Sequence, residues 1–521
     1  MTRASSGSVR APSGRIREDG EDPRRERFNG RNRSFAESLE LLSTRLEHAL
    51  ARTAVFAIFG CLLTSVALAA IAHVVLLTAV PLLGLVLTCF VALAAPRPRR
   101  AAVISVFAWA LLARIVAVIA LVIADPGYAQ GDFLSPDGRA YLSGSRALLE
   151  ARFAVPSPVT YFGTYDVGHY YLFAGASALL GSSVVALELL NGALAALSAA
   201  LLFVWATALA PKHAGVLGSV AALSPSLILL STANLLKDPS IVFATAIVLW
   251  AVTKLALPCR EPTSVATRAP WLCIALIALV YLHLTRFYVA AYLELGLLIA
   301  AALALLRNWR AQAPGLLAIL VLVISAEAGS LMAGWPPSPV IFVDQLTRAS
   351  AIRDERTAIA RTFDLEQLLP EAMQPMARSA VGAVRRLCGP FLIVIPDRLD
   401  ARYVLAADFA LYPDTLLWLL VLPAFLVGVG LALKHVWTEP QSHFDLGYVA
   451  IFLGLYLAQY LAIDVSYRQR EDVLPIALAF VPAGVAWLES RHARRLAFFG
   501  YLVVIAFGQA LLLAIGGGRP P

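Results

Sequence analysis

Apolar runs of about 17 to 25 residues recur along this chain from Ala54 to Ile515, with short polar stretches between them. A helix needs roughly 20 such residues to cross the hydrocarbon of a bilayer. The pattern therefore predicts an all-α fold, a polytopic transmembrane helical bundle of about thirteen crossings. We expect these at 54–72, 74–95, 101–124, 183–210, 214–233, 239–257, 271–285, 287–306, 314–333, 414–433, 446–464, 473–489 and 496–515.

The short loops between these runs predict an orientation. Basic residues gather in alternate loops, and the positive-inside rule assigns such loops, with the N-terminus, to the cytoplasm. The first 35 residues are rich in Arg, Ser, Gly and Glu, and residues 1–50 are predicted to form a basic, largely disordered cytoplasmic tail with no cleaved signal peptide. The basic loop residues are Arg97, Arg99, Arg100, Lys212, Arg260, Arg268, Arg307, Arg310, Lys434, Arg491, Arg494 and Arg495.

Two long segments then lie on the outer side, and they divide the chain. We expect a transmembrane core over 51–333 with a first outer, catalytic loop at about 125–169, a second outer loop over 334–413, and C-terminal transmembrane helices over 414–521. The apolar stretch from Tyr170 to Leu180 is too short to cross. It is expected to lie on the outer surface as an interfacial or re-entrant helix.

Composition narrows the class of protein. Of 521 residues, 59% are hydrophobic and 15% charged, which is typical of a membrane protein. Much of the net charge of +8 lies in the tail and the inner loops, so the lipid bilayer, and no nucleic acid, is the expected partner. The five Cys form no CxxC pair or zinc spacing. The motifs GxxxxGK[ST], HExxH and GxSxG are absent, so a P-loop ATPase is not supported.

Asp137 is the first candidate for catalysis. It follows Ser135 and Pro136 at a predicted helix start, where the helix dipole stabilises an anion. It is either a simple helix cap or a general base that takes a proton from an acceptor hydroxyl. Asp132, five residues earlier, is an alternative base or a ligand for a divalent cation.

A second candidate is the aromatic stretch that ends the first outer loop. Asp166 and His169 stand there among Tyr165, Tyr170 and Tyr171. Tyrosines at this level are typical of the aromatic belt of membrane proteins. They also suit a sugar or lipid-headgroup site, because rings stack on sugar faces while Asp and His bond hydroxyls. Both interpretations stay open from the residues alone.

The third candidate is a set of cations at the outer helix ends. Lys237 precedes Asp238 and Pro239, which suit a helix start, and Lys237 can neutralise a phosphate or pair with a carboxylate. Arg286, Arg468 and Arg470 offer forked donors that grip phosphate. The alternative role for these arginines is a charged anchor at the interface.

The order of these features resembles the GT-C superfamily of polytopic glycosyltransferases, which includes lipid A aminoarabinose transferases and protein O-mannosyltransferases. The chain departs from the family pattern in several places: two extra apolar segments precede the first outer loop, Val167-Gly168 stands in place of two prolines, Glu188 in place of an Arg, and Gly138 in place of a second acidic residue. The resemblance is carried by Asp137, Tyr141, Ala147-Leu148-Leu149, Tyr165 to Tyr171, Gly181, Ala186 to Asn191, Ser224-Pro225, Lys237-Asp238, Tyr467-Arg468-Gln469-Arg470 and Leu474-Pro475.

This resemblance implies a polyprenyl-phosphate-linked sugar as donor and a glycan, lipid or protein of the envelope as acceptor. It implies an inverting reaction on the outer face of the membrane, with Asp137 as general base and no cofactor beyond a possible divalent cation. The high content of Ala, Arg and Leu with little Lys is typical of a GC-rich bacterial genome, so we expect this membrane to be a bacterial inner membrane. The implied substrate-binding residues are Tyr141, Tyr165, Asp166, His169, Tyr170, Lys237, Asp238, Arg286, Arg468 and Arg470.

Two other functions fit the same pattern of segments. An envelope polysaccharide polymerase or ligase would place its active centre in the second outer loop, where Arg378, Arg385 and Arg386 lie. A transporter of lipid-linked glycans would place charges within helices that face a pathway. Glu294, Glu327 and Asp408 are the few candidates for such charges.

Overall fold

The computed structural model describes residues 35–72, 75–124, 127–128, 136–155, 161–162, 167–232, 235–256, 265–332, 335–336, 340–341, 401–438, 440–462 and 472–516. These residues form helices and turns, with no strand among them. The helices are α2 (Phe35–Ile71), η1 (Val75–Thr78), α3 (Ala79–Leu93), η2 (Arg97–Arg99), α4 (Arg100–Ala124), α5 (Pro136–Glu150), α7 (Gly168–Leu180), α8 (Val184–Leu209), α9 (Ala214–Leu223), α10 (Pro225–Thr232), α11 (Asp238–Ala256), α12 (Val265–Met332), α15 (Ala401–Thr438), α16 (Pro440–Ala462), α18 (Leu474–Ala477), α19 (Val481–Glu489) and α20 (His492–Gly516).

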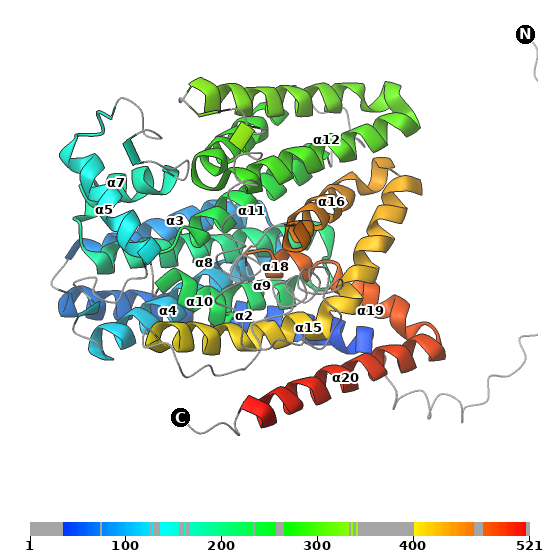
Figure 1. The fold of residues 1–521 in the computed structure, drawn as a ribbon, viewed down its shortest axis with the longest axis horizontal. Helices are drawn as coiled ribbons and strands as arrows, with labels where there is room; N and C mark the ends of the chain where they lie inside the picture. Colours follow the sequence, from blue (N-terminus) through cyan, green and yellow to red (C-terminus); the bar gives the residue numbers. More distant parts are fainter. Residues whose placement is uncertain are drawn as a thin grey trace, which may run out of the picture.

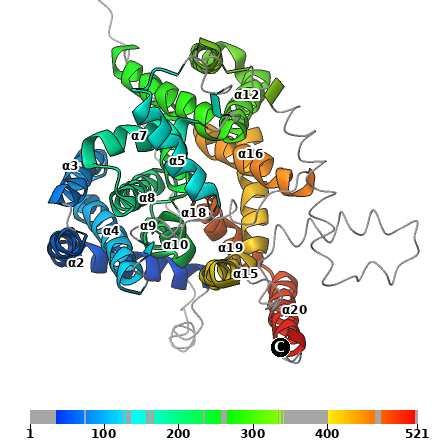
Figure 2. The same cartoon turned by 60° about the vertical axis from the view of Figure 1, so that its left-hand side comes forward.

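The prediction of an all-helical membrane protein is confirmed. Within the described residues, 6 helices are long and apolar enough to cross a membrane, and shorter apolar helices accompany them. Helix α8 is enclosed by its neighbours over most of its length (Figures 1 and 2), and 78% of its most apolar window is buried. On α2, by contrast, Val55, Phe56 and Phe59 are largely exposed. Large apolar side chains on the outside of a bundle are suited to contact with lipid.

The N-terminal helix differs from the expected tail. Residues 35–50 belong to α2, so the part of the predicted tail that the structure describes is helical. Two ion pairs hold this part: Glu47 lies 2.6 Å from Arg99, and Glu40 lies 3.1 Å from Lys212. Ser43 between them is fully buried. This part of α2 therefore packs against the loops that follow α3 and α8, and it is ordered where a disordered tail was predicted.

The predicted crossing at 214–233 consists of two helices, α9 and α10, which meet at Ser224 and Pro225. Proline suits the first turn of a helix but interrupts the one before it. The buried carboxylate of Asp414 in α15 accepts hydrogen bonds from the backbone N–H of Ser226 at 2.9 Å and from the hydroxyl groups of Ser224 and Ser226. It thereby satisfies donors that the start of α10 leaves open.

Helix α12 is a continuous helical run of 68 residues that is not straight. His283 and Glu294 are hydrogen-bonded at 2.8 Å, whereas a straight helix would separate them by about 16 Å. Gly329 also packs against Val280. The run therefore folds back on itself, and Figure 1 shows it as segments that lie above one another. This agrees with the separate crossings expected at 271–285, 287–306 and 314–333.

Two other regions depart from the expected helices. The crossing expected at 473–489 is made of α18 and α19, of 4 and 9 residues, with turns between them. Helix α15 begins at Ala401, inside the range expected as the second outer loop. Most of that loop, including Arg378, Arg385 and Arg386, lies outside the described residues.

Candidate functional site

A buried arginine joins three helical segments at the centre of the candidate site. Arg286 of α12 donates from one terminal nitrogen to Asp472 at 2.9 Å and from the other to Asp238 at 3.1 Å. All three side chains are at least 95% buried. Buried charges of this kind persist only when they are paired. The pairs fasten the start of α11 and the turn that leads into α18 to the middle of α12.

The segment just before α11 is held in place by two polar side chains of α8. Glu188 accepts a hydrogen bond from the backbone N–H of Leu235 at 2.7 Å, and Asn191 donates to the carbonyl oxygen of Leu236 at 2.9 Å. Leu235 has a φ of 48°, a left-handed conformation that a branched side chain rarely adopts. Its neighbours therefore impose the bend that places Lys237 and Asp238.

Lys237 lies among aromatic side chains of two other helices. Its ammonium nitrogen stands 5.9 Å from the centre of the Tyr141 ring in α5, a cation–π distance. The Tyr141 ring packs edge-on against His169 of α7 at 5.0 Å and against Tyr170 at 5.8 Å. Helices α5 and α7 pack against each other and lie together at one end of the bundle (Figure 1).

His169 is fully buried beside these charges. Its Nδ1 lies 3.4 Å from the hydroxyl of Ser240, and its ring packs against Phe173. Burial, and then the positive charge of Lys237, lower the pKa of His169 to about 3. His169 is therefore a neutral imidazole near pH 7, which can donate or accept a hydrogen bond but carries no charge.

This pKa predicts that acid destabilises the fold. The unfolded chain binds a proton at His169 once the pH falls below the ordinary pKa of 6.5, whereas the folded chain does not bind it until about pH 3. The stability of the fold therefore falls as the pH falls through this window. From pH 6 to pH 5 we expect the wild type to lose about 1 kcal/mol more than His169→Gln. Thermal unfolding in detergent at both pH values measures the difference. His435→Gln, at an exposed position, should behave as wild type; equal losses in His169→Gln and wild type would contradict the prediction.

Gly168 allows α7 to pack closely on α12. A Cβ built at Gly168 would stand 2.5 Å from the hydroxyl oxygen of Thr285 and 3.0 Å from the backbone of Leu284. Atoms do not approach so closely without displacement. This contact places the start of α7 next to the turn that carries Arg286.

We therefore expect Gly168→Ala to destabilise the protein by about 1–3 kcal/mol, because the added methyl group must push α7 away from α12. The matched control is Gly175→Ala in the same helix, where nothing lies within 4 Å of the added atom. That substitution should leave stability unchanged or raise it by up to about 1 kcal/mol. Thermal unfolding of both variants is the measurement, and similar values for the two would show that the contact is not tight.

Asp137 stands at the start of α5, one helical turn before Tyr141, and its side chain is exposed. Residues four apart share one face of a helix. The structure thus places Asp137 on the same face of α5 as Tyr141, one turn before it. It also confirms the helix start predicted for Ser135-Pro136-Asp137, since α5 begins at Pro136.

The structure brings together six of the residues proposed from sequence: Tyr141, His169, Tyr170, Lys237, Asp238 and Arg286. Arg286 is proposed as a phosphate clamp, whereas here its terminal nitrogens bond two carboxylates. The proposed residues Asp132, Tyr165, Asp166, Arg468 and Arg470 lie outside the described residues.

Sequence reasoning did not select Asp472, Glu188 or Asn191 as parts of the site. Asp472 lies two residues after Arg470, at the end of a charged stretch and directly before the crossing expected at 473–489. That position was the feature by which it could have been selected. Glu188 appears in the sequence only as a departure from the family pattern. In the structure it is fully buried and holds the backbone at Leu235.

A small cavity lies beneath the ion pairs. It has a volume of about 20 Å³, and its lining includes Arg114, Asp238, Asp472, Pro239 and Pro475. A water molecule fits such a space, but a sugar does not. Arg114 is buried here and donates to Ser231 at 2.9 Å and to the carbonyl oxygen of Ala222 at 2.9 Å.

No protein-family model matches this chain, and no curated protein matches it. Among solved structures, the chain is similar to the crystal structure of ArnT from Cupriavidus metallidurans bound to undecaprenyl phosphate, with 15% sequence identity and a TM-score of 0.38. The similarity covers 76% of this chain and 63% of ArnT, so the chain spans less than two thirds of that protein.

Proposed function

We propose that this protein is a membrane glycosyltransferase that moves a sugar from a polyprenyl-phosphate donor to a glycan, lipid or protein acceptor of the cell envelope. The observation that carries the proposal is the grouping of Lys237, Asp238, Arg286 and Asp472 under the tyrosines of α5 and α7. Charges and rings of these types suit a phosphate and a sugar side by side.

The exposed Asp137 carboxylate is the proposed general base. It takes the proton from the acceptor hydroxyl, whose oxygen attacks the anomeric carbon while the bond to the lipid phosphate breaks on the opposite face, so the configuration inverts. The departing phosphate gains negative charge. A cation already in place at Lys237 stabilises that charge without reorganisation. Arg286 keeps the start of α11 in position through its ion pair with Asp238.

The position of the site fits a donor dissolved in the membrane. The apolar surfaces of the bundle suit the hydrocarbon tail, and the charged group lies at the end of a candidate span, α11. We place this end on the outer, periplasmic face of a bacterial inner membrane, with the N-terminus in the cytoplasm, because the basic loops predict that orientation. The acceptor then enters from the aqueous side over α5.

The test is a transfer assay on the full-length protein in detergent or liposomes with a set of polyprenyl-phosphate sugars. We expect release of polyprenyl phosphate from one donor when an envelope acceptor is present, and an inverted anomeric configuration in the product. No consumption of any donor by folded protein, with membrane extract as the acceptor source, would overturn the proposal. Activity that survives replacement of the α5 and α7 site residues but depends on the second outer loop would favour a polymerase or ligase.

A further inference from the structure

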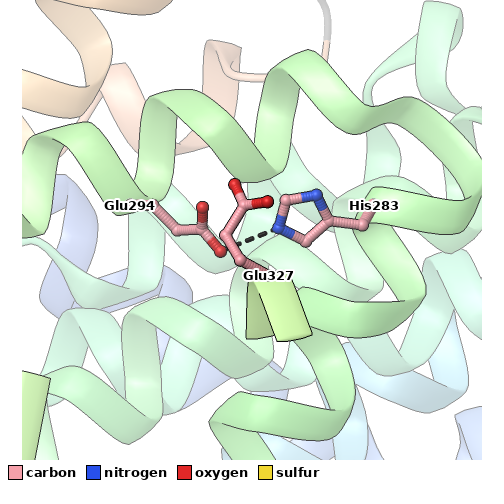
Figure 3. Close-up of side chains that lie close together, drawn as sticks. All are labelled: His283, Glu294 and Glu327. Atoms are coloured by element: carbon pink, nitrogen blue, oxygen red, sulfur yellow. Dashed lines mark hydrogen bonds and ion pairs between the residues drawn. The ribbon is translucent and has the colours of Figure 1, made fainter. Parts of the chain in front are cut away.

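A second group of ionisable side chains lies inside the folded-back helix α12. His283, Glu294 and Glu327 come from three separate parts of this run, and Figure 3 shows their side chains pointing toward one another. One ligand atom from each lies within 4.8 Å of the other two. His283 and Glu294 are almost completely buried, and the His283 Nε2 lies 2.8 Å from a carboxylate oxygen of Glu294.

The chemistry of this group is that of a metal site. Two carboxylates so close together repel each other strongly at low dielectric, and a bound cation removes that repulsion. One imidazole and two carboxylates are ligands of zinc and of other divalent transition metals. A tetrahedral zinc ion with ligands at about 2.1 Å holds them roughly 3.4 Å apart, so small side-chain movements would complete the site.

A fourth polar side chain also points to a ligand here. Tyr448 of α16 is fully buried, and its hydroxyl has no hydrogen-bond partner among the described residues. It lies close enough to Glu294 to interact with it electrostatically. The Tyr448 ring lies beside Gly296, two residues after Glu294, at van der Waals distance from a Cβ built there. A cation or its bound water beside Glu294 would give this hydroxyl a partner.

The position of the group explains what a cation would do. His283 is one helical turn before Arg286, and Glu294 is about two turns after it, on the other side of the bend in α12. Glu327 belongs to the part of α12 that folds back onto these turns. A cation shared by the three would therefore fasten the bend that presents Arg286 to Asp238 and Asp472.

We propose that His283, Glu294 and Glu327 bind one divalent transition-metal ion, zinc in the first instance, which fixes the fold-back of α12. The site is separate from the proposed sugar site and does not depend on the glycosyltransferase assignment. Its role is positional, because the ion would hold Arg286 in place through the helix and would not touch a substrate.

The test is the metal content and thermal unfolding of the full-length protein, purified in detergent and freed of loosely bound metal. We expect about one zinc ion per chain by elemental analysis, and a lower unfolding temperature after treatment with a strong chelator. Zinc should restore that temperature; restoration by manganese alone would support the site with a different occupant. In His283→Gln and Glu327→Gln we expect affinity to fall by at least about 100-fold and the chelator to have no further effect.

The matched control is His435→Gln, which removes an exposed histidine outside the group and should keep the metal of the wild type. Wild type without bound metal, whose unfolding temperature responds to neither zinc, manganese nor chelator, would overturn the proposal. Equal metal content in wild type, His283→Gln and Glu327→Gln would overturn it as well. Because the readout is metal content and unfolding, failure here leaves the proposed transfer reaction untouched, and failure of the transfer assay leaves this site untouched.

Discussion

Asp137→Asn is expected to lower the rate of sugar transfer by about 10²- to 10⁴-fold while the protein stays folded. The amide has the shape of the carboxylate but cannot accept the proton of the attacking hydroxyl, and general-base catalysis is typically worth that factor. Little stability is at risk, because the side chain is exposed and an acidic residue in the first turn of a helix contributes only about 0.3–1 kcal/mol.

Transfer should be measured for wild type and variant at saturating donor, together with the unfolding temperature of each. Glu150→Gln is the control, since it removes a carboxylate from the other end of the same helix. It should leave the rate within a few-fold of wild type. Full activity in Asp137→Asn would move the base to Asp132 or Asp166, and equal losses in both variants would point to a general effect on α5.

Arg286→Met is expected to destabilise the protein by about 3–5 kcal/mol, because it leaves the carboxylates of Asp238 and Asp472 buried without their cation. Methionine fills a similar space, so the loss would come mainly from charge and not from packing. Thermal unfolding in detergent and the yield of monodisperse protein are the measurements. We expect activity to fall with the loss of fold.

A triple variant, Arg286→Met with Asp238→Asn and Asp472→Asn, separates charge from geometry. It removes the unpaired charges, so most of the stability should return, whereas transfer should remain impaired if the ion pairs align the site. Arg99→Met is the control for a less buried pair, and removing its contact with Glu47 should cost no more than about 1 kcal/mol. Similar costs for Arg286→Met and Arg99→Met would contradict the structural role of Arg286.

The helical fold was largely predictable because each crossing is encoded locally. The apolar run expected at 101–124 corresponds to α4, Arg100–Ala124, and the one at 183–210 to α8, Val184–Leu209. The interruptions were harder to locate. Pro225 splits one expected crossing, and the extension of α2 back to Phe35 depends on packing partners such as Lys212 that lie far away in sequence.

The site was predictable only in part, for a related reason. Ionisable residues at helix ends, such as Lys237, Asp238 and Arg286, stand out against apolar surroundings and could be selected without knowing their partners. The ion pairs between them could not be predicted, because Arg286 and its partner Asp472 are separated by 186 positions. Glu188 shows the same limit. Its carboxylate holds the backbone amide of Leu235, 47 residues away, and no sequence motif predicts that hydrogen bond.

The contact between Asp414 and the start of α10 has a consequence for biogenesis. The acceptor follows the Ser226 donors by 188 residues, so it is absent when α9 and α10 first enter the membrane. At translation rates of about 5–20 residues per second, α10 spends roughly 10–40 s without this partner. Until then its start has the local cap in which the Ser224 hydroxyl accepts from the backbone N–H of Leu227 at 3.3 Å, while the Ser226 backbone N–H lacks the Asp414 acceptor. Helix α10 therefore acquires this contact only after synthesis has passed Asp414, so its packing against α15 is completed late in synthesis.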